Sequence, residues 1–201
     1  VRALAGNLAA APWTRRFCDE RSNTHFPTPP ARVLMTSVAE IEAYVNALGP
    51  AWGTHIDIGV AAGALLFDPA LRPAMQAFVP VSMSETPLAG RPFDWNRPHT
   101  VRAMVLMTDG ANCCYHTGDP ATRWAEPGPH DAATVELCRG LRDRGVGIYT
   151  VAFLAAERGI DLMMACASSA NHFYNSDSAG LIDTFRAISR RIQLQSLRLT
   201  Q

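Results

Sequence analysis

The sequence contains no lysine, and its formal net charge is zero, with 18 basic and 18 acidic residues. All the basic residues are therefore arginines, which we interpret as a sign of GC-rich coding. These arginines are scattered along the chain and form no stripe. A protein that binds nucleic acid by neutralising phosphates needs a concentrated positive surface. The charge pattern therefore argues against a nucleic-acid partner.

Long hydrophobic runs are also missing. The longest apolar stretch, Ile58 to Phe67, is too short to cross a bilayer. Residues 1–12 lack a basic stretch followed by an apolar core, so no signal peptide is visible. The chain begins at Val1, which indicates a processed product or a fragment, and we favour a fragment. Its 201 residues, 48% of them hydrophobic, suit one α/β domain or one domain with a loose extension.

Motifs that mark several enzyme classes do not occur. There is no CxxC, HExxH, GxSxG or GxxxxGK[ST], which excludes zinc ribbons, zincins, hydrolase elbows and phosphate loops as far as motifs can. The glycines of "GVGIYTVAF" lead into a strand and not into a helix, so they do not form a dinucleotide-binding motif. The adjacent Cys113 and Cys114 diverge too much to chelate one zinc ion together. Ser168, Ser169 and His172 suggest a hydrolase, but no pattern places a base against a nucleophile.

Periodicity predicts an α/β chain. Arg102–Met107 and Gly147–Leu154 are apolar without alternation, which is typical of strands buried on both faces. A short strand at 32–35 and an edge strand at 172–174 are also expected. Helices are predicted at 36–48, 57–67, 131–144, 161–167 and 177–197, and long loops at 80–100 and 111–130. This alternation of strands and helices indicates a doubly wound fold with a mostly parallel sheet.

Local signals refine these elements. Thr36 and Ser37 are suited to cap the helix that follows them. Gly145 stands where a left-handed residue ends a helix. Ser176 or Asp177 is expected to cap the last helix. The small residues from Ala61 to Ala64 would let their helix approach a sheet closely.

The tryptophans offer a possible binding surface. Trp13, Trp52, Trp95 and Trp124 all fall in predicted loops. Two or more of them could gather at the carboxyl edge of the sheet and bind a protein, because tryptophan is enriched at interface hot spots. The alternative, which we favour, is that each tryptophan covers a local apolar patch.

Asp109 is the first candidate site residue. With Thr108 and Gly110 it ends the apolar run of the strand at 102–107, and ligands of parallel sheets bind beyond the carboxyl ends of the strands. The alternative is that Asp109 only shapes a turn with Gly110. Thr54 lies in a Gly-Thr loop before a helix, which opens on the same edge. A carboxylate, a hydroxyl and water are ligands that Mg²⁺ accepts.

Several segments resemble one family when they are taken together. "GTHIDIGVAAGALLFDP", "RAMVLMTDGAN", "GVGIYTVAF", "CASSANHFYNSDSAGLIDTFRAISRRI" and the terminal "LRLTQ" resemble, in this order, the von Willebrand factor A-like domains of TadG-type proteins. These proteins belong to bacterial tight-adherence (Flp) pilus assembly systems. The similarity covers residues 33–201 and leaves residues 1–32 as an irregular N-terminal segment. It implies a von Willebrand A-type sheet whose carboxyl edge carries a metal-ion-dependent adhesion site.

The resemblance assigns metal ligands residue by residue. The family's threonine matches Thr54 and its aspartate matches Asp109, but its DxSxS segment has no match. The only nearby polar cluster, Asp19 to Asn23, lacks that pattern. Either the chain begins downstream of the first strand, which would then be missing, or the metal site has decayed. We expect weak binding of Mg²⁺ or another divalent cation, with an acidic residue of the partner as the last ligand.

The implied function is non-enzymatic. The domain would bind protein partners of the pilus or cell-envelope machinery outside the cytoplasm, at the periplasm or the cell surface. The membrane anchor that such proteins generally have would lie upstream. One alternative is an α/β hydrolase or phosphotransferase that uses Asp109, although Ala111 stands where a dehalogenase-type enzyme needs a second aspartate. Another is a structural domain with a dead metal site.

The five cysteines leave a pairing question. Cys138 and Cys166 lie on successive βα units, which are usually neighbours in space. The resemblance implies an oxidising compartment, so a Cys138–Cys166 disulfide is expected, with two buried thiols as the alternative. Cys18 and one of Cys113 and Cys114 could form a loop disulfide or remain thiols. The odd number leaves at least one cysteine outside any intramolecular pair.

Overall fold

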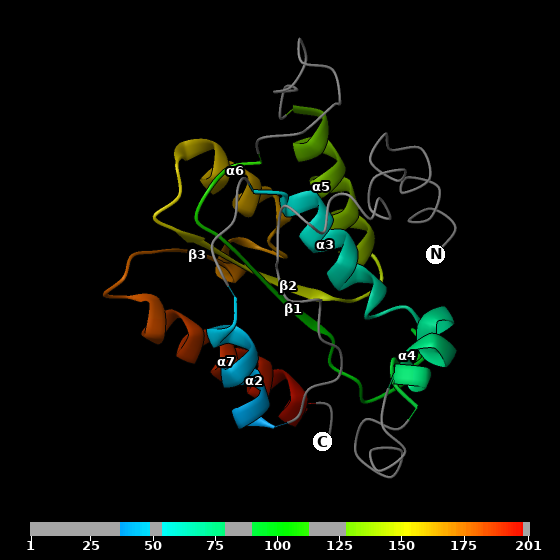
Figure 1. Ribbon diagram of the computed structural model, residues 1–201. Coiled ribbons are helices and arrows are strands. Elements are labelled where there is room, and N and C mark those ends of the chain that lie inside the picture. Colours follow the sequence, from blue (N-terminus) through cyan, green and yellow to red (C-terminus); the bar gives the residue numbers. More distant parts are fainter. Residues whose placement is uncertain (1–36, 49–53, 79–89, 113–127, 199–201) are drawn as a thin grey trace. The chain divides into compact units, whose positions relative to one another are not determined.

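A computed structural model describes residues 37–48, 54–78, 90–112 and 128–198 (Figure 1). The chain divides into two compact units: residues 1–52 with 68–93, and residues 53–67 with 94–201. The first unit includes the helix α2 (Val38–Asn46), the 3₁₀ turn η1 (Pro69–Leu71) and the helix α4 (Arg72–Phe78). The predicted strand at 32–35 and the segment 1–32 lie outside the described residues.

The second unit contains a parallel sheet of three strands in the order β1-β2-β3. These are β1 (Ala103–Thr108), β2 (Gly147–Phe153) and β3 (Phe173–Ser176). Val105 is paired with Tyr149 across β1 and β2, and Val151 is paired with Tyr174 across β2 and β3. The predicted parallel α/β architecture is therefore confirmed, and the expected edge strand begins at Phe173.

Helices cover both faces of this sheet (Figure 1). One face carries α3 (Ile56–Leu65), α5 (Gly128–Arg142) and α6 (Glu157–Cys166), and the other carries α7 (Leu181–Arg198). On the first face, the buried Thr150 hydroxyl donates to the carbonyl oxygen of Met163 in α6 at 2.9 Å. On the second, Tyr149 and Val151 form a buried cluster with Ile188 of α7.

Small residues bring α3 close to the sheet, as the sequence predicts. A Cβ atom on Gly63 would lie 2.8 Å from the Cε atom of Met104 in β1. Ala61 and Ala64, on the same helix, are buried. Because any larger side chain at position 63 would displace Met104, the small-residue stretch determines how near the helix lies to β1.

The helix ends agree with the sequence in two of three places. Ser37 caps α2 by accepting a hydrogen bond from the Glu40 N–H, and Gly145 has a φ of 79°. The expected cap of α7 at Ser176 or Asp177 is wrong, because the helix begins only at Leu181. There, the Asp177 carboxylate accepts from the Gly180 N–H at 2.8 Å and holds a turn instead.

Other boundaries also shift. The helix α5 begins at Gly128, inside the predicted loop at 111–130, because Pro129 fits the first turn of a helix although its pair with glycine suggests a loop. The helix α6 begins at Glu157, earlier than predicted. The helix α4 was not expected. It follows η1, where the Asp68 carboxylate accepts from the Ala70 N–H at 3.0 Å.

A disulfide joins Cys138 of α5 to Cys166 at the end of α6. Both residues are fully buried, and this is the pair expected from the sequence. Arg142, also on α5, donates to the backbone carbonyl oxygens of Ala165 and Cys166 at 2.8 Å each. A covalent bond and an arginine therefore hold the C-terminal end of α6 against α5. Cys18, Cys113 and Cys114 lie outside the described residues.

No single helix in the described ranges is long and apolar enough to cross a membrane. The segments Ile56–Leu65 and Pro69–Met75 meet that criterion only when they are taken together.

Candidate functional site

The turn that follows β1 presents Asp109 at the carboxyl edge of the sheet. The buried hydroxyl of Thr108 accepts from the Gly110 N–H at 3.2 Å and donates to the Gly110 carbonyl oxygen at 3.0 Å. These two bonds close a tight turn around Asp109. The Asp109 side chain is exposed, in the position that the sequence predicts for a site residue.

Thr54 lies directly beside this turn. A Cβ atom on Gly110 would lie 3.2 Å from the Thr54 hydroxyl oxygen. On α6, a Cβ atom on Gly159 would lie only 2.6 Å from the Gly110 carbonyl oxygen. Two glycines therefore allow the loop before α3 and the first turns of α6 to close on the Asp109 turn. The structure brings the Thr54 side chain next to the residue that follows Asp109.

Asn112 connects this turn to two helices. It is almost fully buried, and its Oδ1 atom accepts from the Ile56 N–H at the start of α3 at 2.7 Å. Its Nδ2 atom donates to the Asp131 carboxylate at 2.8 Å and to the Thr134 hydroxyl at 3.3 Å, both on α5. One side chain thus fixes the loop after β1 to the N-terminal ends of α3 and α5.

A buried acid and a histidine lie in the same region. Asp57 of α3 is fully buried, and its Oδ2 atom lies 2.9 Å from Nδ1 of His130 in the first turn of α5. Asp131, beside it, accepts from Nε of Arg158 on α6 at 2.8 Å. These pairs bind the N-terminal ends of three helices together behind the Asp109 turn.

The surroundings of His55, at the start of α3, shift its pKa. Burial lowers the pKa of His55 below its ordinary value of 6.5. Asp57 opposes this shift and the neighbouring His130 adds to it. Burial at the carboxyl edge therefore favours the neutral form of His55.

The donors of this edge fit a divalent cation only in part. Within the described residues, no three His, Cys, Asp or Glu side chains are grouped so that they could hold a metal ion. Thr54 and Asp109 offer one hydroxyl and one carboxylate. Such a pair suits a hydrated Mg²⁺ that takes further oxygens from water or a partner, and it does not make a complete protein cage.

Sequence reasoning missed the polar network behind the turn. Asp57, Asn112 and His130 are far apart in the sequence, and the histidines there look scattered. A usable signal existed, because Asn112 follows Asp109 in the loop after β1, and His130 and Asp131 open a helix that points to the same edge. Their pairing depends on the tertiary structure, which local patterns do not encode.

Two features belong to the amino edge of the sheet. The ring of Trp95 lies beneath the guanidinium carbons of Arg102 and Arg144, at 5.6 and 5.8 Å. These arginines precede β1 and β2, so Trp95 does not lie at the carboxyl edge that a tryptophan cluster would need. The other three tryptophans lie outside the described residues.

Ser169 and His172 also lie there, immediately before β3. The Ser169 hydroxyl is 2.7 Å from Nδ1 of His172, a contact that sequence patterns did not reveal. Burial, with help from Arg191, lowers the pKa of His172 below 6.5. In the described part of the chain no carboxylate orients this histidine, so the pair lacks the third member of a hydrolase triad.

Comparison with known proteins gives a likeness to solved structures but no sequence match. No protein-family model and no curated protein sequence matches the chain. A solved structure that resembles it is the vWF domain of the type V pili tip protein Mfa5 from Porphyromonas gingivalis. The TM-score is 0.46 and the sequence identity 17%, over 78% of this chain and 73% of that chain. A likeness of this size does not establish a family.

Proposed function

We propose that the chain is a von Willebrand A-type protein-binding domain of a TadG-like pilus assembly protein. It would act outside the cytoplasm, without catalysis, and bind its partner through the carboxyl edge of the sheet. The observation that carries the proposal is the position of Thr54 against the turn of Asp109 and Gly110. The resemblance assigns Thr54 and Asp109 to a metal-ion-dependent adhesion site.

Other features of the second unit support this proposal. Asn112 and the pair of Asp57 and His130 hold the edge rigid, which lowers the entropy cost of binding. The Cys138–Cys166 disulfide suits an oxidising compartment. A divalent cation at Thr54 and Asp109 would supply positive charge for an acidic group of the partner. The absent DxSxS segment would leave that cation weakly held.

Thermal unfolding with EDTA, Mg²⁺ or Mn²⁺ tests the metal part of the proposal. An ion that binds only the folded chain stabilises it by RT ln(1 + [L]/Kd), about 2.7 kcal/mol at a hundredfold excess over Kd. We expect the ions to raise the Tm of the natural chain. Asp109→Ala and Thr54→Val should each abolish or reduce this rise.

Asp161→Ala is the matched control, because Asp161 is exposed on α6. It should keep the full metal response. If the natural chain shows no response, the site is dead, and the carboxyl edge would have to bind partners without metal. If Asp161→Ala loses the response as Asp109→Ala does, the ion binds elsewhere.

An assay of turnover separates the binding domain from an α/β enzyme. Nitrophenyl phosphate and nitrophenyl acetate report a phosphotransferase or hydrolase that uses Asp109, and the acetate also tests Ser169 with His172. We expect no hydrolysis above the buffer rate. Hydrolysis that disappears in Asp109→Ala or Ser169→Ala would replace the binding proposal with an enzyme.

A further inference from the structure

The strand β1 has the composition of a central strand, but within the described residues its two faces are covered unequally. On the face of α3, Met104 is 8% and Thr108 5% exposed. On the opposite face, Val105 and Met107 are 41% and 46% exposed. Parallel strands are normally covered by helices on both faces. In the part of the chain that the structure describes, helices therefore cover the apolar α7 face of β1 only in part.

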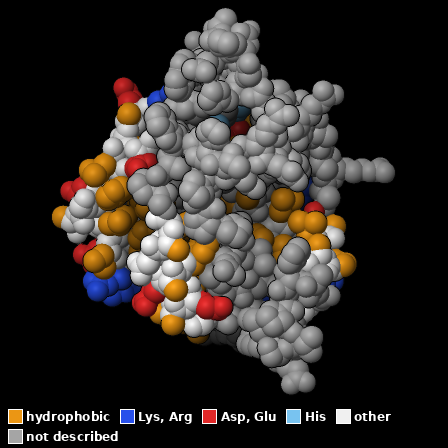
Figure 2. All heavy atoms as spheres, in the orientation of Figure 1, with side chains coloured by type: hydrophobic (Ala, Val, Ile, Leu, Met, Phe, Trp, Pro, Cys, Tyr) orange, Lys and Arg blue, Asp and Glu red, His pale blue; other side chains and the backbone are white. Residues whose placement is uncertain are grey.

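The helix α7 extends this apolar surface. Ala103, on the same face of β1 as Val105, packs against the cluster that contains Ile188 of α7. Toward its N-terminal end, α7 exposes Ile182 (65%) and Phe185 (38%). Figure 2 shows hydrophobic side chains gathered where Figure 1 places the first turns of α7. We call Val105, Met107, Ile182 and Phe185 the β1/α7 surface.

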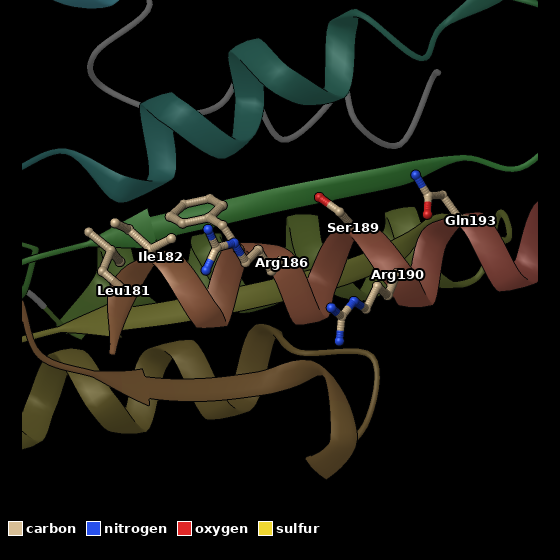
Figure 3. A pocket seen from close by; sticks show the side chains of 7 residues that line it. Leu181, Ile182, Arg186, Ser189, Arg190 and Gln193 are labelled. Atoms are coloured by element: carbon tan, nitrogen blue, oxygen red, sulfur yellow. The ribbon is translucent and has the colours of Figure 1, made fainter. Parts of the chain in front are cut away.

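A shallow hollow lies along α7 beside this surface. Its volume is about 520 Å³, and it is lined by seven side chains of α7: Leu181, Ile182, Phe185, Arg186, Ser189, Arg190 and Gln193. Figure 3 shows Ile182, Ser189 and Gln193 on the side of α7 along which β1 runs. The hollow follows the helix for several turns, which suits an elongated occupant parallel to α7 rather than a compact ligand.

The rim of the hollow is positively charged. Arg186 and Arg190 line it. Arg186 is paired with the exposed Asp183 at 3.0 Å, whereas Arg190 has no acidic partner within the described residues. Overall α7 carries four arginines and a single acidic residue. A helix that covers the apolar floor would therefore be favoured by carboxylates along its edge.

We propose that the β1/α7 surface binds an acidic amphipathic helix of a partner protein. The apolar stripe of that helix would cover Val105, Met107, Ile182 and Phe185, and its acidic residues would meet Arg186 and Arg190. This surface lies on a face of the sheet and includes neither Thr54 nor Asp109, so the inference does not depend on the metal site. It adds a second interaction surface to the domain.

The test uses the whole chain and two synthetic amphipathic peptides with one identical leucine stripe. One peptide carries glutamates beside the stripe and the other carries lysines. Fluorescence anisotropy should show binding of the glutamate peptide and weaker binding, by about tenfold or more, of the lysine peptide. The variant Arg186→Glu/Arg190→Glu should reverse this preference. Arg139→Glu, on the exposed surface of α5, should leave it unchanged.

Three results would overturn the proposal. Equal binding of both peptides, or of neither, would show that the surface does not select an acidic helix. A dimeric mass in light scattering that Ile182→Ser abolishes would mean that a second copy covers it. The chain could also bind phosphatidylglycerol vesicles but neither peptide. If Arg186→Glu/Arg190→Glu then removes the vesicle binding, the β1/α7 surface binds a membrane.

Discussion

Asn112 is the residue on which the geometry of the carboxyl edge depends most directly. Its amide satisfies the Ile56 N–H and donates to Asp131 and Thr134. In Asn112→Ala, buried polar groups lose their partners, and each such group costs about 1–3 kcal/mol. We expect the free energy of unfolding to fall by about 2–3 kcal/mol in urea titrations.

Asn175→Ala is the control for this prediction, because Asn175 is exposed on β3. It should leave the urea midpoint nearly unchanged. An Asn112→Ala chain as stable as the control would mean that the amide contacts do not hold the edge. Asn112→Asp keeps the acceptor for Ile56 but places a carboxylate beside Asp131, so we expect it to be destabilised as well.

His55 makes the stability of the chain depend on pH. Burial holds its pKa below 6.5 in the folded state, so on acidification the unfolded chain takes up a proton before the folded chain does. The contribution of His55 to the free energy of unfolding is therefore fully present above pH 6.5. It is lost as the pH falls through and below that value. Urea unfolding at several pH values between about 7.5 and 5 should show this decline.

His55→Gln should reduce that decline. His172 contributes in the same direction, since burial also lowers its pKa. The variant with both histidines replaced should therefore have the flattest profile. An unchanged slope in His55→Gln would show that other groups cause the acid sensitivity.

At the scale of elements, close contact between α6 and the Asp109 turn depends on one glycine. In Gly159→Ala the new Cβ atom would lie 2.6 Å from the Gly110 carbonyl oxygen, which is backbone and cannot rotate away. We expect a loss of about 1–3 kcal/mol in the free energy of unfolding, together with a weaker metal response, because Gly110 adjoins both assigned ligands.

Gly59→Ala is the matched control on α3. A Cβ atom there meets no heavy atom within 4 Å. Replacing a helical glycine by alanine in open space should raise stability by about 0.5–1 kcal/mol. If both variants lose stability equally, the tight approach at Gly159 is not the cause.

A second prediction at the scale of elements concerns the disulfide between α5 and α6. It closes a segment with a sequence separation of 28 and is buried between two helices. Reduction should lower the free energy of unfolding by about 2–4 kcal/mol. Melting with and without dithiothreitol measures this loss. The variant Cys138→Ala/Cys166→Ala should melt at a similarly reduced temperature and no longer respond to dithiothreitol.

The sequence predicted elements well where several local signals agreed. The apolar runs at 102–107 and 147–154 identified β1 and β2, although only β2 is buried on both faces as that pattern predicts, and β1 exposes Val105 and Met107. It failed at α7, where Asp177 favours a turn as readily as a cap. It also failed at Gly128 and Pro129, a pair that can open a helix as well as form a loop.

Of the candidate site, the sequence predicted Thr54 and Asp109 but not the buried polar network behind them. Asp109 follows an apolar strand and Thr54 precedes a helix, so chain order alone places both at the carboxyl edge. The contact of Asp57 with His130 joins residues whose sequence separation is 73. Asn112 is similarly remote from Ile56. Such pairs depend on how helices pack on the sheet, which one sequence without relatives does not reveal.

At the scale of the whole molecule, we expect the strand β1 to promote aggregation of the chain. Within the described residues β1 pairs with β2 alone, and Val105 adds an exposed apolar side chain to this strand. This aggregation, which is distinct from a folded dimer, should increase with concentration on heating. Val105→Lys should reduce light scattering on heating at a given concentration.

Ala132→Lys separates the effect of β1 from that of added charge, because Ala132 is exposed on α5. It adds the same charge far from the strand and should scatter like the natural chain. Neither variant should change the free energy of unfolding by more than about 0.5 kcal/mol, because both sites are exposed. Equal protection by both lysines would assign association to net charge, since a chain whose formal charge is zero has little electrostatic repulsion between its copies. Protection by Val105→Lys alone would assign it to β1.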